Sequence, residues 1–234
     1  MFGLGTIINC SAIVIGGLFG LLFGRFVKEH IQDSLTKACG VCTLFIGIAG
    51  ALEKMLTNEN SGLLIVICLA LGTLFGELLN IENLFERFGE WIKQKTGNDK
   101  DSRFIDAFLC SSLTVCIGAM AIVGSIEDGL SGDYSILATK AILDFIIIMA
   151  MTCAMGKGCI FSAIPVGIFQ GSFTLLAHFI RPIMTETALS NLSVVGSILI
   201  FCVGINLVFG KKLRVANMLP SVILAVIIAF LPIF

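Results

Sequence analysis

The chain has 234 residues, of which 57% are apolar and 13% are charged, and its formal net charge is −1. A soluble domain carries about 25% charged and about 45–50% apolar residues, so this composition excludes an ordinary soluble globular protein. It points to the lipid bilayer as a partner, and the lack of a basic patch interleaved with aromatic residues argues against nucleic acid.

Eight apolar runs approach the roughly 20 residues that a helix needs to cross the hydrocarbon core of a membrane. They cover residues 3–25, 34–56, 61–80, 103–125, 134–156, 158–180, 187–210 and 213–233. The sequence therefore predicts an all-α fold: a polytopic transmembrane helix bundle of about eight spans that forms one domain over residues 1–234.

The first span has no Lys or Arg before its apolar core and no clear cleavage site, so we expect it to be retained rather than removed as a signal peptide. It places Gly16, Gly20 and Gly24 at intervals of four residues, and the third span repeats this spacing with Gly72 and Gly76. Glycines at this spacing let helix backbones approach closely, so we interpret both sets as helix-packing surfaces.

Residues 81–97, between the third and fourth spans, place apolar side chains at helical intervals with charges between them. The apolar positions are Ile81, Leu84, Phe85, Phe88, Trp91 and Ile92. This pattern predicts an amphipathic helix on the cytoplasmic surface of the membrane. It would serve either as an anchoring connector or as a docking helix for a partner protein.

The acidic and glycine-rich segment GSIEDGLSGD after the fourth span predicts an outward-facing turn. Glu127 and Asp128 either sit in water there or form an acidic mouth that attracts cations. Asp133 is expected to cap the fifth span, because its carboxylate can accept hydrogen bonds from the free amides of a helix start. Whether residues 125–133 fold back into the membrane stays open.

The fifth span contains Lys140 and Asp144, four residues apart and therefore on one helix face. A charge at the bilayer centre costs roughly 2.5–3.5 kcal/mol on insertion scales, and pairing offsets part of that cost. The couple is either a structural ion pair that fixes the rotation of the helix or an ion-responsive pair in a solute path.

Three further polar residues are expected near the middle of the membrane: Asn9 in the first span, Gln170 in the sixth and Asn206 in the seventh. Each one either forms a hydrogen bond between helices or lines a path for a solute or ion together with Lys140 and Asp144.

The second and seventh spans contain similar stretches, CTLFIGIAGAL and LIFCVGINLVF, which align Gly47 with Gly204. Because these spans are expected to run in opposite directions, spans 1–3 and 6–8 would form an inverted repeat around spans 4 and 5. Inverted repeats are common in transporter folds, although chance similarity between apolar helices explains the match equally well.

Lys and Arg residues are distributed unevenly between the two sides of the eight-span topology. The loops after spans one, three, five and seven hold Arg25, Lys28, Lys37, Arg87, Lys93, Lys95, Lys100, Arg103, Lys157, Lys211, Lys212 and Arg214, whereas the other side holds Lys54 and Arg181. Positive loops favour the cytoplasm, so we expect both termini outside.

The sequence offers little support for an enzyme, a metal site or a cofactor. Cys39 and Cys42 form a CxxC without the second pair or nearby histidine that a zinc site needs. The motifs HExxH and GxSxG are absent. Asp133 and Asp144 lie about 16 Å apart along one helix, so they cannot converge as a protease dyad.

The segments CIGAMAIVGSIEDGLSGD, SAIPVGIFQGS and RVANMLP, with GTIIN and GGLFG near the N-terminus, resemble the YqgA/YdfK-like bacterial membrane proteins, domain-of-unknown-function family 554. The resemblance spans essentially the whole chain and implies a multi-pass protein of the bacterial cytoplasmic (inner) membrane, without a substrate. The matching motif residues are Asn9, Gly118, Gly124, Glu127, Asp128, Gly129, Asp133, Asp144, Pro165, Gln170 and Asn217.

The function expected from these features is transport: a carrier or channel for an unidentified small solute or ion. The alternative is a structural or regulatory membrane subunit that does not transport. Assembly into a homo-oligomer is left open by the sequence.

Overall fold

The computed structural model describes residues 3–56, 61–98 and 101–230, and no strand occurs in these ranges. Its helices are α1 (Leu4–Gly24), α2 (Glu29–Met55), α3 (Ser61–Leu79), α4 (Ile81–Lys95), α5 (Phe104–Cys116), α6 (Ala119–Ser131), α7 (Ser135–Met155), α8 (Ala163–Leu175), α9 (Ala177–Ile180), α10 (Glu186–Phe209) and α11 (Pro220–Ile228). Short 3₁₀ turns are η1 (Lys157–Ser162), η2 (Arg181–Ile183) and η3 (Val215–Met218).

Within the described ranges, six helices are long and apolar enough to cross a membrane, and the bent pair α5–α6 makes a seventh candidate. An eighth apolar segment, Val215–Ile228, is shorter. The predicted all-α, multi-pass class is confirmed, and about eight crossings are consistent with the fold.

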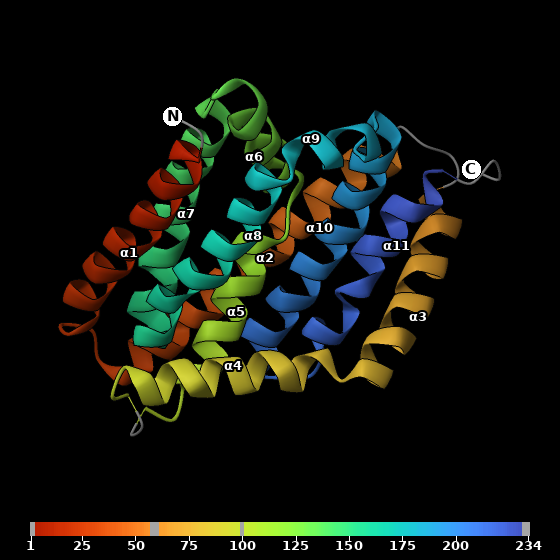
Figure 1. The fold of residues 1–234 in the computed structure, drawn as a ribbon. Helices are drawn as coiled ribbons and strands as arrows, with labels where there is room; N and C mark the ends of the chain where they lie inside the picture. The colour runs from red at the N-terminus through yellow and green to blue at the C-terminus, as the bar shows by residue number, and fades with distance from the viewer. Residues whose placement is uncertain (1–2, 57–60, 99–100, 231–234) are drawn as a thin grey trace.

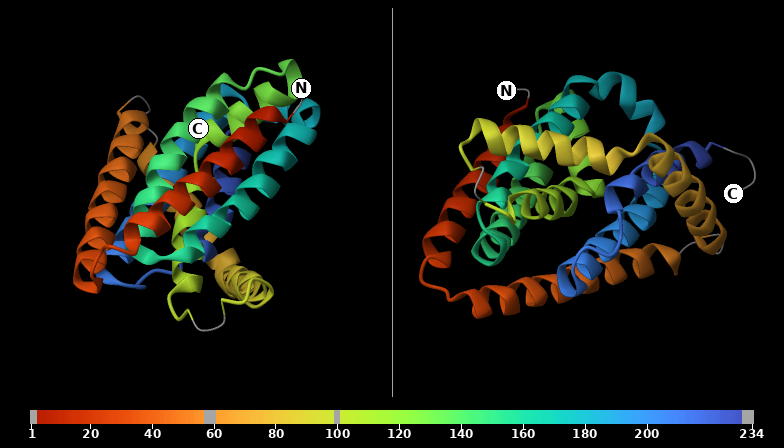
Figure 2. Two further views of the ribbon diagram at one scale, coloured as in Figure 1. Left: turned by 90° about the vertical axis from the view of Figure 1, so that its left-hand side faces the viewer. Right: turned by 90° about the horizontal axis from the view of Figure 1, so that it is seen from below.

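The crossings alternate in direction, so the two ends of the bundle differ (Figure 1). The described chain begins and ends at one end, which we call the terminus end, and α4 lies across the other, the α4 end. Seen from below, α4 crosses in front of the bundle, and α2 runs along one edge with α10 against it (Figure 2). The positively charged loops after α1, α7 and α10 lie at the α4 end (Figure 1).

The glycine stripes of the first and third spans lie at close helix contacts. A Cβ atom added at Gly16 would lie 2.5 Å from the carbonyl oxygen of Phe145 on α7. A Cβ atom added at Gly20 would collide with the carbonyl oxygen of Met149 on the same helix. Gly72 and Gly76 meet Ser221 and the Asn217 backbone in the same way. Glycine is required at these positions because neighbouring backbone occupies the space of a side chain.

The second and seventh spans, α2 and α10, pack against each other through the two glycines that align in sequence. A Cβ at Gly47 would lie 2.6 Å from the Phe201 amide nitrogen, and one at Gly204 would lie 2.8 Å from the Leu44 amide nitrogen. Phe201 lies 157 positions after Leu44, and Gly204 lies 157 positions after Gly47. Adding 157 to the residue numbers of α2 therefore gives the α10 residues that take the same part in this contact.

The same offset of 157 also relates two other antiparallel helix pairs. In the pair α1–α8, Cys10 lies against Gly167, with 3.3 Å between its sulfur and an added Cβ. In the pair α3–α11, Cys68 and Ala225 belong to one buried apolar cluster. Any antiparallel pair has a local two-fold axis, but a shared offset for three pairs is the pattern expected of an inverted repeat.

The fourth crossing differs from the single span expected over 103–125. The chain leaves helical geometry at Ile117, whose φ and ψ are −82° and 114°, and α5 and α6 are bent by 62° relative to each other. The expected turn in the acidic segment is wrong, because α6 continues through it to Ser131 and ends only at Gly132, where φ is 74°. The break therefore lies about two helical turns before the segment, not within it.

Candidate functional site

The buried core of the bundle contains an ion pair between α7 residues and a third polar side chain from α1. Lys140 Nζ donates to both carboxylate oxygens of Asp144, at 2.8 and 2.7 Å. Asn9 Nδ2 donates to Asp144 Oδ2 at 3.0 Å. The three residues are between 0% and 7% exposed, so the bonds form away from solvent.

Local helix geometry and close packing create this cluster. A spacing of four residues places Lys140 one turn from Asp144 on the same face of α7. Gly16 and Gly20 let α1 lie directly on α7, and this close approach brings Asn9 into hydrogen-bonding distance. Two of the sequence-predicted site residues and a third from another span therefore come together.

The break between α5 and α6 lies beside this cluster. Cys116 and Ile117 pack against the apolar core that includes Ile13 and Ile148. Ile13 is one turn from Asn9 and Ile148 is one turn from Asp144. An interrupted membrane helix exposes unpaired backbone groups and dipole ends at membrane depth, where transporters build their binding sites.

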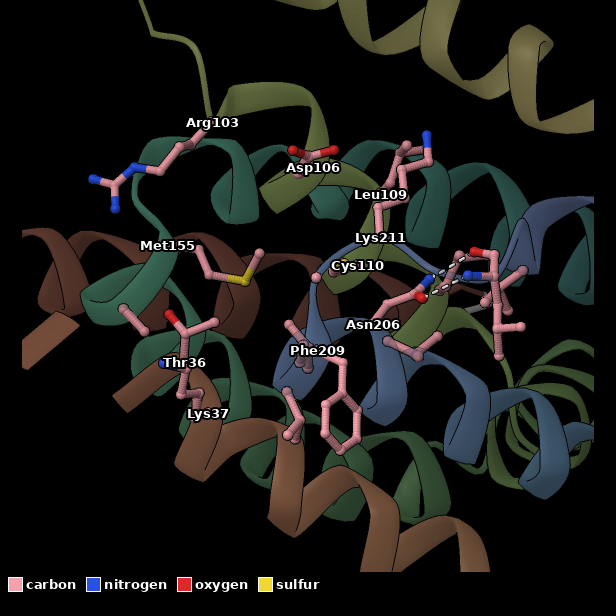
Figure 3. A pocket seen from close by; sticks show the side chains of 18 of the residues that line it. Thr36, Lys37, Arg103, Asp106, Leu109, Cys110, Met155, Asn206, Phe209 and Lys211 are labelled. Carbon is pink, nitrogen blue, oxygen red and sulfur yellow. Dashed lines mark hydrogen bonds between the residues drawn. The ribbon is translucent and has the colours of Figure 1, made fainter. Parts of the chain in front are cut away.

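A cavity of about 670 Å³ opens at the α4 end of the bundle. We call it the vestibule. Figure 3 shows its labelled side chains, which come from α2, α5, α7 and α10 and from the residues that adjoin α5 and α10. Its inner wall is apolar, with Leu109, Cys110 and Leu113 on α5, Met155 on α7 and Val203 on α10. The volume lies within the range of about 300–1,000 Å³ typical of small-molecule sites.

The vestibule ends about one helical turn from the break in the fourth crossing. Leu113 lines it, and three residues further, about 4.5 Å of helix, α5 ends at Cys116. The buried side chains of Ile148, Met151 and Leu199 belong to the same core cluster as Leu113 and Val203. These three residues form an apolar plug between the vestibule and Asp144.

Charged residues gather at the vestibule mouth. Lys211 Nζ lies 2.9 Å from Glu82 Oε1 and also pairs with Glu86, both on α4. Burial disfavours the charged lysine, but the hydrogen bonds that Lys211 donates to Glu86 and Glu82 outweigh this effect and raise the pKa of Lys211. The mouth also holds Asp106, an exposed carboxylate.

Asn206 lies at the vestibule mouth rather than near Asp144. Its Oδ1 accepts the backbone N–H groups of Lys212 and Leu213 at 2.9 Å, and its Nδ2 donates to the Leu213 carbonyl at 2.7 Å. The expectation that it clasps another helix near mid-membrane is wrong, because its hydrogen bonds shape the loop that follows its own helix.

The two adjacent acids of the segment 125–133 differ in burial. Asp128 is fully buried, and its Oδ2 accepts the N–H of Gly5 at 3.0 Å. Both expectations for Asp128, a carboxylate in water or in an acidic mouth, are therefore wrong, because α6 turns it against the start of α1. Glu127 is half-buried. Asp133 Oδ1 accepts the N–H of Ser135, the first residue of α7, at 2.9 Å.

Gln170 lies on the buried stripe of α8 with Val166 and Thr174. It is 1% exposed, and neither its oxygen nor its nitrogen has a hydrogen-bond partner among the described residues. The structure does not bond it to Asp144. α8 packs against both α1 and α6, so Gln170 adds an unpaired amide to the same half of the bundle.

Sequence reasoning missed the vestibule. Its wall takes residues such as Cys110, Met155 and Val203 from helices far apart in the chain, and each is an ordinary apolar residue within its own span. Among the described residues, no group of three or more His, Cys, Asp or Glu could hold a metal ion.

Comparison with known proteins gives a match over nearly the whole chain. The family model described as "Protein of unknown function (DUF554)" matches residues 4–230. The "Uncharacterized membrane protein YdfK" of Bacillus subtilis (strain 168) is 29% identical over 226 residues, which cover 97% of this chain and 95% of that protein. The "Uncharacterized protein YqgA" of Escherichia coli (strain K12) is 30% identical over 234 residues, covering 95% and 94%. No solved structure matches the chain.

Proposed function

The chain belongs to the DUF554 family, it is a multi-pass membrane protein, and its relative YdfK is named a membrane protein; we propose that it transports a small solute or ion across the bacterial inner membrane. The observation that carries this proposal is the vestibule, which reaches to about one helical turn from the broken helix, with a buried ion pair beyond an apolar plug.

The proposed route has three parts. A solute enters the vestibule from the α4 end, stops at the plug of Ile148, Met151 and Leu199, and reaches Asp144 when the plug parts. A buried charge is expensive unless it is paired, so residues of this kind inside a membrane mark transport paths by default. The paired state of Asp144 fits a resting conformation in which Lys140 substitutes for a cationic solute or ion.

The proposed orientation places the α4 end in the cytoplasm and both termini outside. The loops after α1, α7 and α10 lie at the α4 end (Figure 1), and these loops carry many of the Lys and Arg residues that favour the cytoplasm. In this orientation the vestibule faces the cytoplasm.

We also propose that the chain catalyses no covalent reaction.

The test is solute flux into liposomes that contain the purified protein, screened over cations, anions and metabolites. Asp144→Asn should abolish or alter flux, because it removes the charge that the route depends on. This variant also leaves Lys140 buried without a counter-charge, which costs about 3–5 kcal/mol, so a folding defect could imitate the result.

The double variant Lys140→Met with Asp144→Leu removes both charges and keeps the volume. Replacing a whole buried ion pair by apolar residues is often neutral for stability, so this variant should fold and insert but carry no flux. Normal flux in the double variant would show a structural pair and would favour the alternative, a non-transporting membrane subunit.

A further inference from the structure

Three unpaired oxygen atoms belong to side chains in the first turns of α1 and at the end of α6 that contacts it. They are Oγ1 of Thr6, Oδ1 of Asn9 and Oδ1 of Asp128, and none of them has a hydrogen-bond partner among the described residues. Thr6 is 9% exposed, and Asn9 and Asp128 are 0% exposed. Buried polar atoms are normally bonded, so three together require an explanation.

The contacts of α1 place these atoms in one region. Asp128 binds the N–H of Gly5, the residue before Thr6, through its other carboxylate oxygen at 3.0 Å. Asn9 follows Thr6 by three residues, and side chains at this spacing are neighbours on a helix surface. Asn9 also bonds Asp144, so the region adjoins the proposed transport site.

The buried charges of this region do not balance. Lys140 neutralises Asp144, whereas no cationic side chain bonds Asp128 among the described residues. The start of α1 offers about half a positive charge, but Asp128 lies in the last turn of α6, whose end offers about half a negative charge. About one negative charge therefore remains, and a buried, unpaired charge is strongly destabilising.

The helices around α6 bring no compensating buried cation. Those that pack against it are α1, α7, α8, α9 and α10. Apart from Lys140 and Asp144, the charged or titratable groups on these six helices that face the terminus end are Glu127, which is half-buried, and the exposed His178 and Glu186.

We propose that Asp128, Thr6 and Asn9 bind one sodium ion. Hard cations take oxygen ligands, and a single uncompensated carboxylate matches a monovalent ion. A proton would neutralise Asp128 but would leave the Asn9 oxygen unpaired. The role of this ion as the coupling ion of transport rests on the proposed function, whereas the binding itself does not.

Binding can be measured without flux, by thermal unfolding of the detergent-purified protein in sodium chloride against choline chloride at constant ionic strength. Sodium should raise the unfolding temperature by about 3 °C for each tenfold increase above its dissociation constant. Asp128→Asn should abolish this shift, and its side chain can still accept the Gly5 N–H. The matched control is Glu127→Gln, which changes the adjacent acid on the same helix and should respond as the wild type does.

Thr6→Val provides a second test if Asp128→Asn fails to fold. It keeps the shape of the side chain and removes one oxygen ligand. It should therefore move the sodium response to higher sodium concentration while leaving the unfolding temperature in choline unchanged.

An unfolding temperature that is equal in sodium and choline would overturn the proposal. So would a sodium response retained in Asp128→Asn, or a dependence on pH alone that Asp128→Asn removes, since that would assign a proton. A sodium shift without any flux would leave this site standing and refute only the transport proposal.

Discussion

Lys211 shows how one side chain can fix a loop to a surface helix. It follows α10 and bonds Glu82 and Glu86 of α4, and the Glu82 side chain is only 5% exposed. The pair is therefore asymmetric: the lysine reaches from solvent to a carboxylate that is almost entirely buried. Loss of the lysine would leave that buried carboxylate without its counter-charge.

Lys211→Met should destabilise the protein by about 1–2 kcal/mol, which discounts the 3–5 kcal/mol of a fully buried pair because the lysine is partly exposed. The pKa of Lys211 is raised above its ordinary 10.5, so the stabilising charged form persists at neutral pH and disappears only as the pH rises through the raised value. Thermal unfolding of variant and wild type should therefore differ equally at pH 7 and pH 9, about where lysine is still fully charged. Glu86→Gln, which alters the more exposed partner, is the control, and a larger effect from that variant would contradict the assignment.

Single residues also mark the limit of sequence reasoning. The spacing of Lys140 and Asp144 was enough to predict their pairing, because both lie on one helix. The bond from Asn9 was beyond prediction, since it depends on how closely α1 lies on α7. Asp128 was misplaced because its glycine and serine neighbours favour a turn, whereas packing against α8 and α9 holds the segment helical.

At the scale of elements, α2 and α10 depend on two glycines that face each other's backbone. A methyl group at Gly47 would lie 2.6 Å from one backbone atom of α10, and one at Gly204 would lie 2.8 Å from a backbone atom of α2. Backbone cannot move aside as a side chain can, so α2 and α10 would have to separate.

Gly47→Ala and Gly204→Ala should each lower stability by about 1–3 kcal/mol, the usual effect of overpacking. Gly171→Ala is the matched control, because a Cβ there meets nothing within 4 Å, and alanine should stabilise α8 slightly through its higher helix propensity. Thermal unfolding in detergent measures all three. Equal unfolding temperatures for the three variants would mean that α2 and α10 do not need this close contact.

Span positions were the most predictable elements, because each depends only on a long local run of apolar residues. The bend between α5 and α6 could not be predicted, since CIGAMA is as apolar as its neighbours. The vestibule was equally hidden, because it arises only where α2, α5, α7 and α10 come together around Cys110.

For the whole molecule, the offset of 157 residues carries a consequence for the proposed transport cycle. Vestibule residues Thr36 and Lys37 on α2 correspond under this offset to Ser193 and Val194 on α10. In a transporter built from inverted repeats, the two halves exchange conformations, and the opposite end opens at the corresponding residues.

Cysteine labelling tests this exchange in a variant free of the native cysteines. Lys37→Cys should react quickly with a membrane-impermeant maleimide from the α4 end. Val194→Cys is 2% exposed as valine, and it should react slowly from the terminus end, whenever the alternate state forms. Ile13→Cys, at a core position that is 0% exposed, should stay unlabelled. An inert Val194→Cys in a protein that carries flux would contradict the exchange.

The break at Ile117 separates the fourth crossing into two parts that pack against partly different neighbours. The part nearer the α4 end, α5, packs against α4 and η1, whereas the part nearer the terminus end, α6, packs against α8 and α9. Helical hydrogen bonding is interrupted between Cys116 and Ala119, so the break is the place where α5, near the α4 end, and α6, near the terminus end, would change their relative angle. A hinge of this kind would let one half of the crossing move without unwinding the other.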